Sequence, residues 1–411
     1  MSPRLLPSGV RAYLAFVRTN RRLLAFGLFT AALSGFGQTF YIGLFNPQLR
    51  EAFSLSHGEL GLVYGGATLA SAALLPWLGR LYDSVDLRLF LIGAASLLAL
   101  GCLLLFGAGG LVGLLGAFFL LRVGGQGLMG HIALTTMARR FHGGRGKAVS
   151  IAAMGFPLPE ALLPLAAVAL LAMLEWRAAW AVNAGLVVVL FLPLLLWLLH
   201  GASDGEAPEP GGHRTGRDHT LREVVRDGRF ALLVPATFVG PFVVTIAFFH
   251  QVPMAHAKGW STELVASGLT LFALGHVVGL FGGGPLVDRW SAARVFVPTL
   301  LPLAAAMAVL ALFQGAWAAL LWPGLMGLGM GLSASATSSL LAELYGVAHL
   351  GAIRSLLHSF AIVSTAVGPP ALGRLLDVGI GTGPIAAGLA TGVAVAGLLA
   401  ATGIARYRAS E

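Results

Sequence analysis

The stretch GRLYDSVDLR at residues 79–88 is a short polar segment between two apolar runs. A related stretch, GPLVDR, returns at residues 284–289, and its first glycine lies 205 positions after Gly79 (284 − 79). The same offset relates further pairs of identical residues, which chance alone would seldom produce. We therefore expect a duplicated chain whose halves share one fold. The pairs are Leu81 and Leu286, Asp83 and Asp288, Ser56 and Ser261, Gly146 and Gly351, Ser150 and Ser355, and Pro164 and Pro369.

The composition indicates a membrane protein. Hydrophobic residues make up 57% of the chain and charged residues 10%, whereas soluble domains carry about 25% charged residues. A membrane-spanning helix needs roughly 20 apolar residues, and the sequence contains twelve such stretches, six in each half. The prediction is an all-α membrane protein. The spans are expected to begin near Leu23, Leu60, Leu89, Val112, Ala148, Ala178, Phe230, Leu264, Val295, Ala316, Ala352 and Pro384.

The net charge of +9 does not indicate nucleic-acid binding, because the basic residues lie in short loops rather than on one face. Their distribution predicts orientation instead, since Lys and Arg gather in cytoplasmic loops. With the N-terminus in the cytoplasm, all but five of the 26 basic residues face inwards. We expect a monomeric, multi-pass inner-membrane protein with both termini cytoplasmic. The exceptions are Arg50, Arg177, Lys258 and Arg374, which face outwards, and Arg122, which lies within a span.

The domain boundaries follow from these spans. The first span is expected to run from Leu23 to Asn46, where the Asn46-Pro47 pair ends it. Thr220, with Glu223 three residues later, predicts a capping box at the start of a short amphipathic helix. This helix either lies on the inner leaflet or is simply solvated. The expected segments are a tail at 1–22, a bundle at 23–200, a linker at 201–229, a bundle at 230–406 and a tail at 407–411.

The polar turn resembles the signature loop of the major facilitator superfamily, Gly-x-Leu-x-Asp-Arg-x-Gly-Arg, which follows the second and eighth helices of that family. The second copy is the cleaner match, whereas Ser84 and Asp86 replace the family's Arg and Gly in the first copy. The resemblance implies two six-helix bundles about a pseudo-twofold axis, each built from inverted three-helix repeats, with a site near the midplane. The first copy keeps Gly79, Leu81, Asp83 and Arg88.

The resemblance also implies a conformational latch. Asp83 and Asp288 are expected near the N-termini of the eleventh and fifth spans, where a carboxylate is stabilised by about 0.3–1 kcal/mol. These contacts would exist in one conformation only and would hold the cytoplasmic side shut. The alternative is that the two aspartates serve solubility and topology. The latch residues implied are Gly79, Asp83, Arg88, Gly284, Asp288 and Arg289.

Arg122 lies inside the fourth span, where an arginine costs about 2.5–3.5 kcal/mol. The stretch RVGGQG at residues 122–127 resembles the Arg-x-x-Gln-Gly motif of the family's fourth helix, with one additional residue before Gln126. The resemblance implies a role in proton coupling or in binding a charged substrate. Glu160 in the fifth span is expected at a similar depth, so we predict that it pairs with Arg122. A static bridge between the two spans is the alternative.

Proton coupling needs a titratable group within the spans, and histidine titrates nearest to physiological pH. His276 lies in the middle of the eighth span, so we expect Glu160 or His276 to carry the proton. A hydrogen-bonded core residue is the alternative for His276. We expect no metal, because His250 and His256 lack further ligands, and no cofactor. No phosphate-binding loop for ATP occurs.

The stretches FGQTF at residues 36–40 and ELYG at residues 343–346 resemble the bacterial monocarboxylate and oxalate/formate branch of the superfamily. The arginine that this branch carries in helix eight is not evident here, where GHVVG occupies residues 275–279. We expect proton-coupled transport of a small organic anion, with hydrogen bonds from Gln38, Tyr41 and Gln126. The alternatives are an exporter of amphiphilic drugs or metabolites and a membrane sensor that moves no ligand. An enzyme is disfavoured, because no nucleophile–base pair is found.

Overall fold

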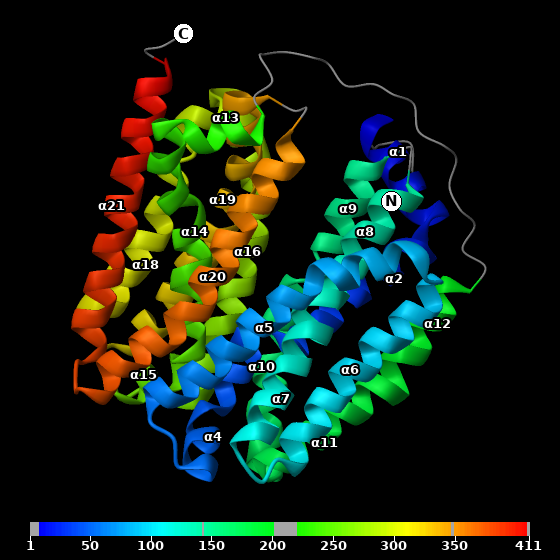
Figure 1. Ribbon diagram of the computed structural model, residues 1–411, viewed down its shortest axis with the longest axis vertical. Coiled ribbons are helices and arrows are strands. Elements are labelled where there is room, and N and C mark those ends of the chain that lie inside the picture. Colours follow the sequence, from blue (N-terminus) through cyan, green and yellow to red (C-terminus); the bar gives the residue numbers. More distant parts are fainter. Residues whose placement is uncertain (1–7, 142–143, 201–219, 347–348, 409–411) are drawn as a thin grey trace.

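The computed structural model describes residues 8–141, 144–200, 220–346 and 349–408, and every secondary-structure element in these ranges is a helix. Two bundles stand side by side in Figure 1. The N-bundle comprises α2 (Arg21–Leu33), η2 (Ser34–Gly37), α3 (Thr39–Ile42), η3 (Gly43–Phe45), α4 (Asn46–Phe53), α5 (His57–Ser84), α6 (Leu87–Gly107), α7 (Leu111–Leu121), η4 (Arg122–Met129), α8 (Gly130–Arg140), α9 (Arg145–Ala153), α10 (Pro157–Met173), α11 (Trp176–Gly185), η5 (Leu186–Phe191) and α12 (Leu192–Leu199).

The second half of the chain forms the C-bundle. A short helix, α13 (Leu221–Arg226), precedes it, and the predicted capping box between Thr220 and Glu223 is present. The C-bundle comprises α14 (Gly228–Phe249), α15 (Gln251–His256), α16 (Thr262–Trp290), α17 (Ala292–Val295), η6 (Pro298–Leu300), α18 (Leu301–Leu312), α19 (Ala316–Tyr345), α20 (Leu350–Asp377) and α21 (Thr382–Arg408). Of the expected linker at residues 201–229, residues 201–219 lie outside the described residues.

Helices occur at all twelve predicted spans. Ten helices in the described ranges are long and apolar enough to cross a membrane, and the segments 21–37 and 39–53 form an eleventh as a bent pair. The ninth predicted span corresponds to the shorter apolar helix Pro298–Leu312. The all-α membrane fold predicted from the composition is therefore confirmed.

The predicted duplication appears in the helix boundaries. The offset of 205 positions relates the first residues of α5 and α16, α6 and α17, α7 and α19, and α9 and α20. Ser56 and Ser261 occupy the same place in the two halves, because each caps its helix through its side-chain oxygen. The two halves thus repeat not only the order of their helices but also the residue that caps the second span of each half.

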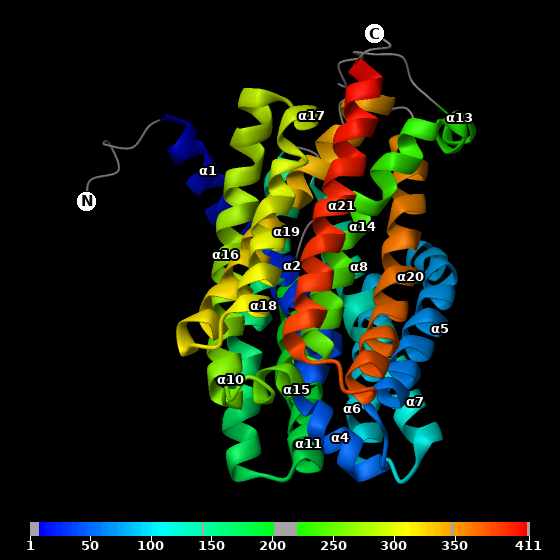
Figure 2. The same cartoon turned by 90° about the vertical axis from the view of Figure 1, so that its left-hand side faces the viewer.

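The two bundles are close together at one end of the molecule and apart at the other (Figure 1). We call the end that carries α1 (Ser8–Thr19), α13 and the last turn of α21 the terminal end, and the end that carries α4 and α15 the distal end. Figure 2 shows the same arrangement from the side. The bundles meet where α20 packs along α5 and where α10 packs along α16.

Glycines bring α5 and α20 into backbone contact near the distal end. A Cβ on Gly61 would lie 2.7 Å from Cα of Pro370, and one on Gly65 would collide with the backbone oxygen of Ala366. Gly66 has nothing within 4 Å of its Cβ position. Small residues permit such close helix packing within a membrane. α5 can therefore pack this closely against α20 only because positions 61 and 65 carry no side chain.

Three polar contacts close the distal end. The Asp377 carboxylate accepts hydrogen bonds from the backbone N–H groups of His57 and Gly58 at 2.9 and 2.8 Å, and so caps the N-terminus of α5. The Asn46 amide donates to the Phe249 carbonyl at 3.0 Å, and the Gln251 amide donates to the Phe40 carbonyl at 2.7 Å. Asn46 and Gln251 lie 205 positions apart, so equivalent residues of the two halves each donate a hydrogen bond to the other bundle.

The first span is interrupted. Gln38 is extended (ψ 152°) between η2 and α3, and the segments beside it are bent by 41°. A Cβ on Gly37 would lie 2.8 Å from Cα of Gly125, so the two backbones touch at the break. Contrary to expectation, Asn46 and Pro47 start a new helix, α4, directly after η3. Proline fits the first turn of a helix, where its missing N–H leaves no bond unmade.

Candidate functional site

The contact between the bundles includes one pair of titratable groups. Nδ1 of His276 on α16 lies 3.0 Å from Oε2 of Glu160 on α10, and both side chains are largely buried. Both residues lie near the middle of their spans, which cover 262–290 and 145–173. Thr270, two turns towards the distal end, donates to the Ala161 carbonyl at 3.1 Å across the same interface. The pair therefore joins the two halves of the molecule at mid-depth.

Local sequence places Glu160 at the start of a helix. Pro157 begins α10, after a turn at residues 154–156 that separates α10 from α9. Proline is preorganised for the first helical position, and an acidic residue in the first turn is stabilised by the helix dipole. The regular helical hydrogen bonds of the fifth span are thus interrupted just before Glu160.

His276 is held by a glycine seam. On its own helix, a Cβ on Gly275 would strike the Gly324 carbonyl, and one on Gly279 would lie 2.5 Å from the Leu328 carbonyl. From α19, a Cβ on Gly331 would strike the His276 carbonyl. Backbone contact between α16 and α19 leaves little freedom to the segment that carries the imidazole. The glycines of the tenth span thus pack directly against the eighth span.

Arg122 is buried in the N-bundle and is 3% exposed. Its Nη1 lies 3.4 Å from the Gly37 carbonyl and 3.5 Å from Oγ1 of Thr39, and its guanidinium lies 5.3 Å from the ring centre of Tyr64. Tyr64 and Thr39 share a hydroxyl contact of 2.6 Å. No Asp or Glu of the described residues pairs with Arg122. The predicted Arg122–Glu160 pair is wrong for this conformation, because His276 lies against Glu160 instead.

The extra residue in the Arg122 motif has a structural counterpart. Residues Arg122–Met129 form a π-helix, which is wider than an α-helix and is common at functional sites. A π turn accommodates one residue more than an α turn, as the spacing between Arg122 and Gln126 requires. Gln126 is exposed, and its side chain makes no hydrogen bond to the described residues.

The other predicted substrate groups differ in their exposure. Tyr41 is 1% exposed, its hydroxyl accepts a hydrogen bond from Asn183 at 2.7 Å, and its ring contacts those of Phe36 and Trp180. It is therefore a core residue in this conformation. Gln38 is partly exposed and has no side-chain hydrogen bond to the described residues, so it is available to a ligand.

The predicted latch residues lie at the terminal end, where the bundles are apart. Asp83 pairs with Arg139 of its own bundle, and both side chains are about half exposed. Asp288 is exposed, and Arg289 lies against the ring of Trp290. Neither Gly79 nor Gly284 has an atom within 4 Å of its Cβ position.

Asp86, where the family has Gly, caps α6 by accepting a hydrogen bond from the Arg88 N–H at 2.9 Å. Asp83 thus makes its ion pair within its own half here.

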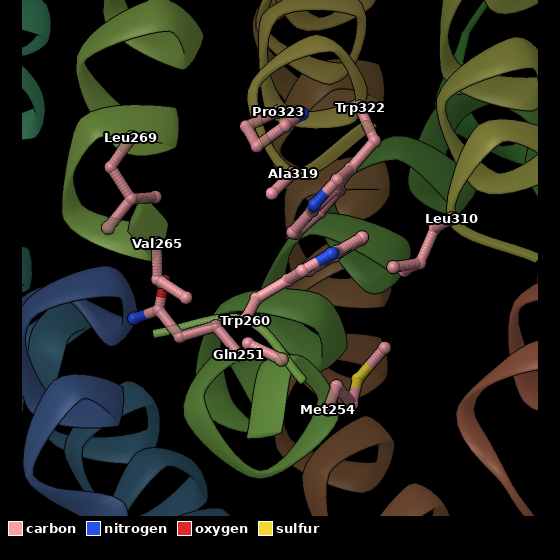
Figure 3. Close-up of a pocket in the computed structure, with 10 residues that line it drawn as sticks. Gln251, Met254, Trp260, Val265, Leu269, Leu310, Ala319, Trp322 and Pro323 are labelled. Atoms are coloured by element: carbon pink, nitrogen blue, oxygen red, sulfur yellow. The ribbon is translucent and has the colours of Figure 1, made fainter. Parts of the chain in front are cut away.

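Sequence reasoning missed the residues that close the distal end, namely Asp377, Asn46 and Gln251. Asn46 and Gln251 could have been found, because they obey the repeat offset. Figure 3 shows that Gln251, Trp260 and Trp322 line the same small apolar cavity. Its volume is about 10 Å³. That volume holds about one water molecule, so this cavity is too small for a substrate.

Comparisons with known proteins agree with this architecture. The family model described as Major Facilitator Superfamily matches residues 27–268 and 236–409. Among solved structures, a bacterial homolog of the human lysosomal transporter Spinster, inward-facing and unoccupied, has a TM-score of 0.69 at 16% identity and covers 94% of this chain and 96% of its own. The nucleoside transporter NupG has a TM-score of 0.68 at 11% identity, covering 93% of this chain and 98% of its own. No curated protein sequence matches the chain significantly.

Proposed function

Because the chain belongs to the major facilitator superfamily, we propose that it carries a small organic anion together with protons by alternating access. The observation that carries this proposal is the Glu160–His276 pair, which joins the two bundles in the middle of their spans. Ionisable groups within a membrane are costly and are normally kept for transport or proton transfer. The basic loops support a cytoplasmic terminal end, so the conformation described here faces inwards.

The Glu160–His276 pair can couple proton binding to the separation of the two bundles. While Glu160 is ionised and His276 is protonated, their attraction supports the contact between α10 and α16. A substrate anion near His276 competes with Glu160 for the imidazolium, and a proton taken up by Glu160 removes the remaining attraction. The bundles then separate at mid-depth only after both proton and anion have bound. Such ordered binding is what couples two fluxes.

Arg122 acts in this scheme through its charge, because its side chain is almost fully buried in this conformation. It holds the break of the first span through Gly37 and Thr39. A positive charge beside this break raises the local concentration of anions in the path between the bundles.

Replacing Arg122 by glutamine is expected to abolish uptake while changing the free energy of unfolding by less than about 1 kcal/mol, because its two hydrogen bonds are long and its Nε has no partner. The control is Arg177→Gln. Arg177 donates to the Ala108 carbonyl at 2.8 Å and closes the end of α6, so its loss should cost about 1–3 kcal/mol. Denaturant unfolding and uptake are measured on both variants. Equal destabilisation of the two would make Arg122 a structural residue.

Two aspartates form reciprocal caps on one helix pair. Asp377 ends α20 and caps α5 in this conformation. Asp83 lies in the last turn of α5 at the terminal end, and it exchanges its ion pair with Arg139 for the N-terminus of α20 when that end closes. The two helices are antiparallel, so each supplies the carboxylate for its partner's N-terminus. Only one cap forms at a time.

Asp377→Asn and Asp83→Asn should therefore shift the conformations in opposite directions, each by about 1–2 kcal/mol or roughly 5- to 30-fold. Hydrogen exchange of the backbone amides at residues 55–62 reports the distal end. We expect faster exchange in Asp377→Asn and slower exchange in Asp83→Asn than in the wild type. A change of the same sign in both variants would exclude reciprocal caps.

The function is tested with purified protein in liposomes. Radiolabelled monocarboxylates should enter faster when the outside is more acidic than the inside, and nigericin, which collapses the proton gradient, should remove the difference. Protein-free liposomes correct for permeation of the neutral acids. Transport of lipophilic cations alone would favour a drug exporter, and binding without any flux would favour a sensor.

A further inference from the structure

The C-bundle contains a cavity of about 290 Å³ between α14, α19 and α20, which lie next to one another in Figures 1 and 2. It occupies the half of the bundle nearer the terminal end, because Arg354 lies in the first turns of α20. None of the residues predicted from the sequence to bind substrate lines it. Its polar lining residues are Thr237, Ser333, Thr337, Ser338, Arg354 and His358.

The cavity is positive and has no acidic lining residue. Arg354 and His358 are four positions apart on α20, so their side chains share one face of the helix. Both are exposed, and Arg354 forms no ion pair with the described residues. The rest of the lining is apolar and includes Pro241 and Met330. The cavity is therefore lined by basic side chains on one helix and by mainly apolar side chains elsewhere.

The repeat shows that the fold does not require this polar set. The positions that precede Ser333, Thr337 and Ser338 by 205 residues carry Leu128, Ile132 and Ala133, which are all buried in the N-bundle. The counterparts of Arg354 and His358 are Val149 and Ala153. These five positions are thus apolar in the N-bundle and polar in the C-bundle. The repeated fold therefore does not by itself require polar residues at these five positions.

We propose that this cavity binds a small organic anion with one carboxylate and a compact apolar body. Arg354 binds the carboxylate through charge-assisted hydrogen bonds, the Thr337 and Ser338 hydroxyls donate further bonds, and Pro241 and Met330 contact the apolar part. The volume lies at the lower end of the range for ligand sites, roughly 300–1,000 Å³. That the cavity binds such an anion does not depend on the proposed function. That this anion is the transported substrate rests on the proposed function.

The test compares three ligands of one shape: benzoate, neutral benzamide and cationic benzamidine. Isothermal titration of the full chain in phosphatidylcholine nanodiscs should show saturable benzoate binding, with benzamide at least about tenfold weaker and benzamidine weaker still. Arg354→Gln should weaken benzoate binding by about 10- to 100-fold, and Arg354→Lys should restore part of it. Arg294→Gln, an exposed arginine at the same end outside the cavity, is the matched control and should bind as the wild type does.

The proposal is overturned if the wild type shows no saturable benzoate binding in the millimolar range, if Arg354→Gln binds benzoate unchanged, or if benzamidine binds as well as benzoate. An anionic lipid headgroup offers the same chemistry, so the titration is repeated with phosphatidylglycerol in the nanodiscs. Unchanged affinity supports a free anion, and loss of benzoate binding assigns the cavity to lipid. Equilibrium binding needs no pH gradient. Benzoate binding without proton-driven uptake would therefore refute the proposed function, whereas the proposal that the cavity binds an organic anion would still hold.

Discussion

Replacing Gly65 by alanine is expected to abolish net transport by preventing the distal end from closing. A methyl group at this position would lie only 2.3 Å from the Ala366 backbone oxygen on α20, and a backbone cannot rotate away as a side chain can. Overpacking of this kind typically costs about 1–3 kcal/mol. That cost falls only on the conformation in which α5 and α20 touch, so it shifts the equilibrium between conformations rather than unfolding the protein.

Gly66→Ala is the matched control, because the Cβ position of Gly66 has no atom within 4 Å. Both variants change one glycine of the same helix to alanine, so their helix propensities change equally. Uptake into proteoliposomes should be lost in Gly65→Ala and retained in Gly66→Ala, with equal amounts of monodisperse protein. Equal activity of the two variants would show that the α5–α20 contact does not open and close during transport.

Replacing Glu160 by glutamine is expected to preserve exchange of the substrate across the membrane and to abolish its accumulation against a gradient. Glutamine reaches His276 with a side chain of the same length but carries no charge and binds no proton. The step in which the proton decides whether the bundles separate is therefore removed. Exchange needs no net proton movement, so it continues, whereas uphill uptake driven by a pH gradient falls to the level of protein-free liposomes.

The control for this variant is Glu263→Gln, which removes an exposed carboxylate from the first turn of α16 and should leave coupling intact. His276→Gln should reproduce the loss of coupling, because it removes the other half of the pair. Proton-driven accumulation that persists in Glu160→Gln would remove this pair from the coupling mechanism.

Much of the fold could be predicted because it repeats. Twelve apolar stretches and a constant offset of 205 positions between identical residues predict the two bundles, and the caps at Ser56 and Ser261 follow the same offset. The capping box at Thr220 could be predicted because it depends on residues three positions apart. These are local or repeated signals.

The partner of Glu160 could not be predicted from depth alone. Arg122 and His276 are both expected near the middle of their spans, and the choice between them depends on which helices face each other across the interface. Glu160 follows the turn between α9 and α10 and lies against His276 of the other bundle, and Arg122 begins the π-helix and lies against Gly37. Both are departures from regular helix geometry, which hydropathy does not record.

The cap that Asp377 places on α5 joins residues 320 positions apart, and it exists only when the distal end is closed. A single acidic residue at the end of the eleventh span carries no local sign of this role. The repeat offset could have identified Asn46 and Gln251, because the two positions are 205 residues apart and each forms a hydrogen bond to the other bundle.

The central claim is that the two bundles open the molecule at one end only when they close it at the other. Spin labels at Ser84 and Ala352 report the separation of α5 and α20 at the terminal end, and labels at Glu51 and Val378 report the distal end. Double electron–electron resonance in nanodiscs should show that Gly65→Ala lengthens the distal distance and shortens the terminal distance relative to the wild type. Distances that lengthen together, or a distal distance that stays unchanged, would contradict the account.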